Sequence, residues 1–157
     1  MKQKDIAKWM KGICILLAIM GGVFFGWIVP KLVGAIRSLD IHLLYWPILI
    51  YIWGIGIACY VILYYFWRVC NEVQKDNSFS KENAKAFVTI SHITLGMAIY
   101  LFFGLIFTVC VGQNYSVMLV MLICAILISI IISILAACLS HLIRKAYEMR
   151  EENELTI

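Results

Sequence analysis

The residues in this chain that could do chemistry are tyrosines, histidines and serines spaced about four positions apart within apolar stretches. Such spacing brings side chains toward one face of a helix. Five of them define a predicted polar seam: Tyr60, His92, Tyr100, Ser129 and Ser133. One interpretation is a polar cavity that binds or transports a small molecule. The alternative is close helix packing, with hydroxyl groups bonding across the contact. The sequence favours packing, because rows of small and polar residues are typical of contacts between membrane helices.

The sequence does not contain the residue patterns of a redox site, a metal site, a protease or a proton-coupled transporter. The six cysteines contain no CxxC pair, so neither a redox motif nor a zinc site has suitable spacing. His42 lies in a loop, His92 lies within an apolar stretch and His141 follows the end of another, so the three are not expected to meet at one metal. No Asp or Glu occurs within an apolar stretch, which argues against a membrane protease and against proton-coupled transport. We therefore expect no catalytic residues, no bound metal and no cofactor.

The elements that must hold these side chains are four long apolar stretches. Hydrophobic residues make up 64% of the chain and charged residues 14%, whereas a soluble domain carries about 25% charged residues. A helix needs about 20 apolar residues to cross a bilayer, and four stretches supply them: 12–30, 43–67, 87–111 and 117–139. Backbone groups in lipid must be hydrogen-bonded internally. The sequence therefore predicts an all-α, polytopic membrane protein that forms a single four-transmembrane-helix bundle.

Lys and Arg residues are distributed unevenly along the chain. Of the 13, only Lys31 and Arg37 lie between the first two stretches, and the other 11 lie in segments 1–11, 68–86 and 140–157. Cytoplasmic segments carry an excess of Lys and Arg, so both termini and the loop 68–86 are predicted to be cytoplasmic. These basic residues are dispersed at membrane edges. Despite the net charge of +4, we therefore expect the bilayer as a partner and no direct contact with nucleic acid.

The segments around the third and fourth stretches contain local folding signals. Ser80 is a good N-cap for the third helix, and Phe79 is placed to pack back on Ala84 as a hydrophobic staple. Arg144 and Glu148 are spaced for an ion pair four residues apart. The fourth helix is therefore predicted to continue past the bilayer into the tail.

Two patterns, one within the first stretch and one after it, predict contacts with the membrane or with another protein. The outer segment Lys31–His42 has apolar residues at roughly helical spacing, and we expect it to lie flat on the membrane. Within the first stretch, Ala18, Gly22 and Gly26 form a small-xxx-small row. If that row is exposed, it predicts a homo-oligomer or a contact with another membrane protein.

Two cytoplasmic segments are candidates for binding a partner. The loop before the third stretch contains Phe79, Glu82 and Asn83. In the C-terminal tail, acidic residues precede an apolar end, and the candidates are Glu151, Glu152, Glu154 and Leu155. The tail is either a frayed terminus, as most chain ends are, or a short docking peptide.

In these segments the chain resembles the bacterial membrane proteins grouped as domain of unknown function 2975. The resemblance covers the four-stretch layout over nearly the whole chain, the sequence Phe79-Ser80-Lys81-Glu82-Asn83, and the acidic-Leu-Thr-Ile ending. Members often have Gly in the turn before the Phe, where this chain has Asn77 and Ser78, and Asp before Leu-Thr, where it has Glu154. The resemblance implies a place in the bacterial inner (cytoplasmic) membrane and no enzyme activity. It also implies a partner, because such proteins are often encoded beside a small helix-turn-helix regulator.

The leading functional hypothesis is a membrane-bound modulator that captures a cytoplasmic helix-turn-helix transcriptional regulator through its inner loop and acidic tail. The tail glutamates could imitate the negative charge of DNA toward a basic recognition helix. One alternative is a small-molecule binder or transporter that uses the polar seam. Another is an accessory subunit of a different membrane protein.

Overall fold

The computed structural model describes residues 3–36, 45–75, 77–111 and 116–155, with the side chains of these residues except at 3–4, 35–36, 111 and 154–155. Every regular element in these ranges is a helix, which confirms the predicted all-α class. Four of the described helices are long and apolar enough to cross a membrane. The chain is therefore a multi-pass membrane protein. It divides into two compact units, Met1–Gln74 and Lys75–Ile157.

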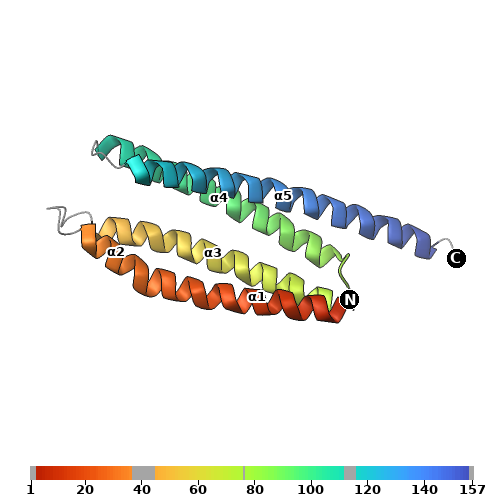
Figure 1. The fold of residues 1–157 in the computed structure, drawn as a ribbon. Coiled ribbons are helices and arrows are strands. Elements are labelled where there is room, and N and C mark those ends of the chain that lie inside the picture. The colour runs from red at the N-terminus through yellow and green to blue at the C-terminus, as the bar shows by residue number, and fades with distance from the viewer. Residues whose placement is uncertain (1–2, 37–44, 76, 112–115, 156–157) are drawn as a thin grey trace. The chain divides into compact units, whose positions relative to one another are not determined.

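The first unit is a helical hairpin (Figure 1). Its first arm runs without a break through α1 (Gln3–Val23), a π-helical turn η1 (Phe24–Ile28) and α2 (Val29–Ile36). The second arm, α3 (Tyr45–Gln74), returns beside the first. Near the turn of the hairpin, Val29 and Val33 pack against Leu49 in a buried cluster.

The π-helical turn is explained by Pro30, which has no N–H to donate. In η1 the N–H of Val29 donates to the carbonyl of Phe24, five residues earlier. In the same register the carbonyl of Phe25 would face Pro30 and would have no backbone donor. The indole N–H of Trp53, on α3, donates to this carbonyl over an N···O distance of 3.3 Å. Because a neighbouring helix satisfies the freed carbonyl, the first arm continues through its proline.

The expectation that the segment Lys31–His42 lies flat on the membrane is wrong for its first half. Residues 31–36 continue the first arm as part of α2, and Val33 is buried against Leu49. Burying this apolar side chain on α3 removes it from water and lipid headgroups, which favours an unbroken helix. Residues 37–44 lie outside the described part of the chain.

The second unit is a hairpin of α4 (Lys81–Val111) and α5 (Ser116–Leu155), which pack side by side along their length (Figure 1). On α5 the buried positions alternate between steps of four and three: Ser129, Ser133, Ala136, Ser140 and Ile143. Such spacing is typical of two helices that wind around each other with a left-handed twist. Small side chains predominate on this face of α5, so the two backbones can approach closely.

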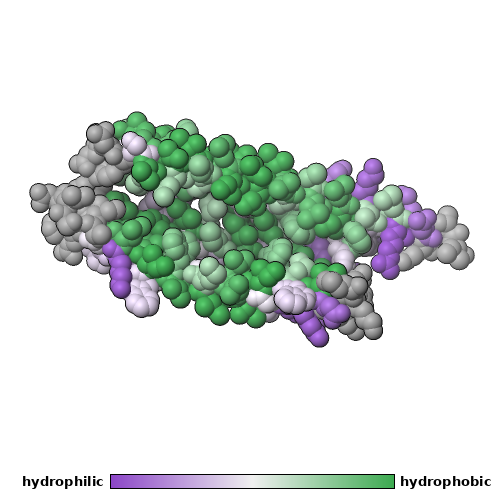
Figure 2. Space-filling view, viewed as in Figure 1, coloured by the Kyte–Doolittle hydropathy of each residue, from purple (hydrophilic) through white to green (hydrophobic). Residues whose placement is uncertain are grey.

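Both long return helices extend beyond the apolar stretches that predicted them. The stretch 43–67 becomes α3, which ends at Gln74, and the stretch 117–139 becomes α5, which ends at Leu155. At 40 residues, α5 is about 60 Å long, roughly twice the thickness of the hydrocarbon core of a bilayer. Figure 2 shows hydrophobic side chains over the middle of the helices and hydrophilic ones toward the C-terminal end of α5.

Candidate functional site

The residues of the predicted polar seam are divided between the two units, and those of the second unit do not share one face. Tyr60 belongs to the first unit, where its hydroxyl donates to the carbonyl of Ala18 over 2.7 Å. On α4, His92 and Tyr100 are exposed. On α5, Ser129 and Ser133 are buried, so the prediction that they face another helix is confirmed.

The buried hydroxyls of the second unit are engaged in bonds. Ser133 donates to the carbonyl of Ser91 over 2.9 Å and lies 3.2 Å from its hydroxyl oxygen. Ser129 donates to the carbonyl of Ala125, one turn earlier on its own helix, over 2.8 Å. Every buried side-chain nitrogen and oxygen within the described ranges has a hydrogen-bond partner. This arrangement is that of a packed contact between helices.

On α4, the seam residues His92 and Tyr100 do not lie on the face that packs against α5. The buried positions of α4 in this region are Ile90, Thr94, Ala98 and Leu101. A row with a fixed step of four turns gradually around a helix that has 3.6 residues per turn. Such a row therefore leaves the contact face after a few turns. The buried positions of α4 stay on that face because a step of three follows the steps of four.

The loop before α4 is held by its own side chains. The N–H of Asn83 donates to the Ser80 hydroxyl over 3.1 Å, which confirms Ser80 as the N-cap. The Asn83 side chain is 1% exposed and donates to the carbonyls of Asn77 and Ser78. Asn83 thus fixes the turn from inside, and this candidate residue is not available at the surface for a partner.

Of the three candidate residues in this segment, Phe79 and Glu82 are exposed. Phe79 keeps 55% of its surface exposed, so the predicted staple on Ala84 does not bury its ring. The carbonyl of Ala84 instead accepts a bond from the Ser140 hydroxyl of α5 over 2.8 Å. The end of the hairpin where α5 packs against α4 thus carries an exposed aromatic side chain.

The acidic tail continues α5 as a helix through Leu155. The backbone of Glu154 and Leu155 is helical, and their side chains lie outside the described ones. Arg144 donates to Glu148 over 2.9 Å, which confirms the predicted pair. Glu152 is exposed. The candidate tail residues are thus carried on a helix, which includes the first two residues of the acidic-Leu-Thr-Ile ending.

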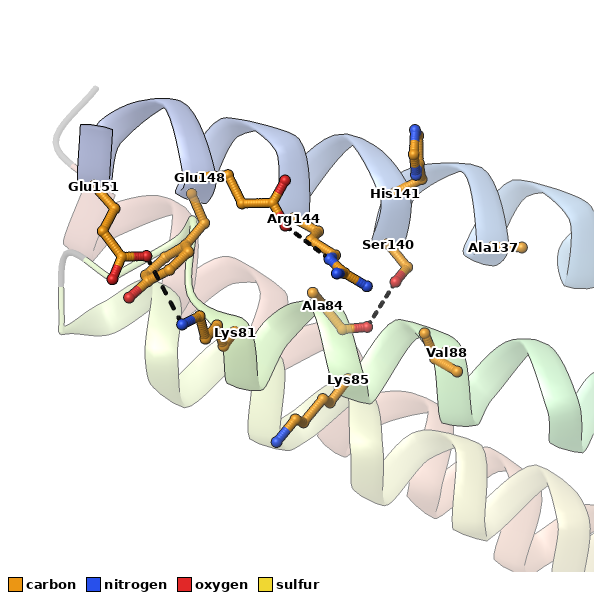
Figure 3. Close-up of a pocket in the computed structure, with 11 residues that line it drawn as sticks. Lys81, Ala84, Lys85, Val88, Ala137, Ser140, His141, Arg144, Glu148 and Glu151 are labelled. Carbon is orange, nitrogen blue, oxygen red and sulfur yellow. Dashed lines mark hydrogen bonds and ion pairs between the residues drawn. The ribbon is translucent and has the colours of Figure 1, made fainter. Parts of the chain in front are cut away.

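One ion pair joins the two candidate segments. Lys81, at the start of α4, lies 3.8 Å from a carboxylate oxygen of Glu151 (Figure 3). The same ammonium group sits 4.8 Å from the centre of the Tyr147 ring. The loop residues 77–85 and the helical tail 144–155 therefore share one end of the second unit, which we call the charged end.

An open groove of about 670 Å³ runs between α4 and α5 at the charged end (Figure 3). Basic residues on both helices line it, with Ala84, Val88 and Ala137 on the side toward the uncharged parts of the helices. His141 points away from α4. Within the described ranges, no three His, Cys, Asp or Glu residues come together as metal ligands.

Sequence reasoning missed a pair of thiols in the first unit. Cys14 on α1 and Cys70 on α3 are 2% and 0% exposed, and their side chains share a hydrogen bond. Nearby, Lys11 donates to Gln74. The two cysteines lie at similar distances in sequence from the segment 37–44, which joins the two arms, so an antiparallel hairpin places them at similar levels. That symmetry was the available signal.

Comparison with known proteins identifies a family. The model that matches is described as Protein of unknown function (DUF2975), and it covers residues 37–157. This part includes α3, α4 and α5 with the charged end. Neither the curated proteins nor the solved structures contained a match. The resemblance noted in the sequence is confirmed, and the chain belongs to the DUF2975 family.

Proposed function

We propose that this protein is a membrane-bound modulator that captures a cytoplasmic helix-turn-helix regulator at the charged end of α4 and α5. The observation that carries the proposal is the pair Lys81–Glu151. Two segments that are 70 residues apart in sequence, each a candidate for partner binding, form one continuous surface. A partner could contact both at once, which a loose terminal peptide would not allow.

The charged end reaches out of the bilayer. No Asp, Glu, Lys or Arg occurs in residues 86–111 or 116–143. Residues 144–155 continue the same helix for about 18 Å beyond that uncharged part. With the Lys and Arg distribution of the whole chain, we propose that this extension and both termini lie in the cytoplasm.

The side chains on this extension suit a basic partner. Glu148 and Glu151 are more than half exposed, and each pairs with a cation of the chain itself. Exposed ion pairs of this kind are worth about 0–1 kcal/mol, so a basic residue of a partner can replace the internal cation at little cost. Phe79 adds an exposed aromatic ring, and aromatic residues are frequent anchors in protein interfaces.

Co-purification from membranes tests this proposal. The tagged chain is expressed with the helix-turn-helix regulator proposed as its partner, and the recovered regulator is measured. We expect the double variant Glu151→Gln with Glu152→Gln to lower recovery at least about fivefold, from the loss of two surface charges. Recovery should also fall with added salt. The control variant, Asp5→Asn with Glu72→Gln, removes the same charge elsewhere and should leave recovery unchanged.

Two results would overturn the proposal. Equal recovery with both double variants would remove the acidic tail from the interface. No recovery with the unaltered chain would remove the regulator as a partner. The small-molecule hypothesis would then be tested next, since it predicts ligand-dependent stabilisation in place of a protein partner.

A further inference from the structure

We propose that the groove at the charged end binds the headgroup of an anionic phospholipid from the surrounding leaflet. Three basic side chains line this groove, from both helices: Lys81, Lys85 and Arg144. An anionic phospholipid has a phosphate group with a net negative charge and acyl chains below it. The groove offers cations at one side and apolar side chains at the other.

The groove lies at the level where the hairpin leaves the bilayer. Lys85 is the last charged residue before the uncharged part of α4, and Arg144 is the first after the uncharged part of α5. The bond from Ser140 to Ala84 holds these two helix segments beside each other. Both cations therefore sit at the same depth, where lipid phosphates are found.

Several donors in the groove remain open. Arg144 uses its Nε for Glu148, and its two terminal amino groups make no bond to other described residues. Lys85 likewise makes no side-chain bond within the described ranges. Guanidinium groups bind phosphate through two parallel hydrogen bonds, and such charge-assisted bonds are strong. A phosphate at Arg144 would fill donors that the chain itself leaves unused. The ammonium group of Lys85 points away from α5 in Figure 3, and this exposed side chain can turn toward a phosphate bound in the groove that it lines.

The two carboxylates of the groove do not prevent anion binding. Glu148 and Glu151 hold Arg144 and Lys81 in place through exposed pairs, which are weak and readily exchanged. The lining then contains three cations and two carboxylates, a net positive charge. The first turn of α4, with its partial positive charge, lies at the same place and adds to the attraction.

The apolar side of the groove selects a lipid over a soluble anion. Val88 is exposed and lies three residues past Lys85, and Ala137 lines the groove about two turns before Arg144, so both are in the uncharged parts of α4 and α5. From there, exposed apolar residues such as Leu95 and Ile134 continue along the same hairpin toward the bilayer centre. An acyl chain attached to the bound phosphate can follow this path, whereas free phosphate gains nothing from it. Basic pockets between membrane helices are known binding places for anionic headgroups.

Native mass spectrometry of the full chain in detergent tests the assignment. The chain is titrated with phosphatidylglycerol or with phosphatidylcholine of the same acyl chains, and the apparent Kd of the first bound lipid is measured. We expect phosphatidylglycerol to bind more tightly. Each cation near a membrane surface contributes about 1 kcal/mol toward an anionic lipid, so Lys85→Gln and Arg144→Gln should each raise the Kd for phosphatidylglycerol about fivefold.

Lys145→Gln is the matched control, because it removes the same charge beside Arg144 on a residue that does not line the groove. It should leave the Kd nearly unchanged. Lys85→Gln is the cleanest variant, since it breaks no internal side-chain bond, and its melting temperature in phosphatidylcholine should match that of the unaltered chain. Equal binding of the two lipids, an equal effect of Lys145→Gln, or full competition by millimolar inorganic phosphate would each overturn the assignment.

Discussion

Ser140 donates its hydroxyl hydrogen to the carbonyl oxygen of Ala84 over 2.8 Å, across the contact between α5 and α4. The two residues are buried. This bond lies at the boundary between the uncharged parts of the hairpin and its charged end. It therefore fixes the level at which both proposed surfaces are assembled.

Ser140→Ala should destabilise the hairpin by about 0.6–1.7 kcal/mol, the range measured for hydrogen bonds between membrane helices. Unfolding in a graded mixture of mild and denaturing detergents would measure the change. Ser129→Ala is the control, because Ser129 is equally buried but bonds only to its own helix. An equal loss in the two variants would mean that the bond to Ala84 contributes nothing of its own.

The close packing of α5 on α4 predicts the effect of larger side chains. Ser133→Leu should destabilise the protein by about 1–3 kcal/mol, because the side chain is 6% exposed and faces Ser91. Cys138→Leu makes a comparable enlargement at an exposed position of the same helix and should be nearly neutral. Melting in detergent compares the two, and a neutral Ser133→Leu would place that face of α5 in lipid.

The thiol pair of the first unit predicts a specific cross-link. Mild oxidation with copper phenanthroline should join Cys14 to Cys70, because their side chains are already in hydrogen-bond contact. Mass spectrometry of the digested protein would detect the linked peptides. Cys59, exposed on the same helix α3, should not link to Cys14. A Cys14–Cys59 product in place of the expected one would contradict the packing of α1 on α3.

The four helices were predictable because their signals are local. Apolar length decides each span, Ser80 caps α4 through residues three positions away, and Arg144 pairs with Glu148 within one turn. These features depend on a few neighbouring residues. Sequence patterns therefore located them correctly, although the ends of the apolar stretches marked the bilayer and not the ends of the helices.

The contacts between helices were less predictable, because they depend on register. A row with a step of four selected His92 on α4, whereas the true face carries Thr94. The pairing of Cys14 with Cys70 requires knowing where the hairpin turns. The bond from Trp53 to the carbonyl of Phe25 requires knowing that Pro30 leaves this carbonyl without a donor. Such relations appear only when two helices are set side by side.

The orientation of the chain gives a prediction from charge alone. In a chain whose native thiols are blocked, a cysteine at Asn77 should resist a membrane-impermeant maleimide applied to intact cells. A cysteine at Asn114, which lies outside the described residues, should react. The excess of Lys and Arg beside Asn77 is the reason. Preferential labelling at position 77 would reverse the proposed orientation and place the charged end outside the cell.

Photo-crosslinking from position 79 tests most directly the claim that the charged end docks a cytoplasmic regulator. A benzophenone amino acid replaces Phe79, whose ring is more than half exposed beside the start of α4, in cells that also contain the proposed helix-turn-helix partner. The control places it at Phe103, which is exposed in the uncharged part of the same helix. We predict a covalent adduct with the regulator from position 79 and none from position 103. The absence of an adduct from position 79, or equal adducts from both positions, would contradict the proposed docking.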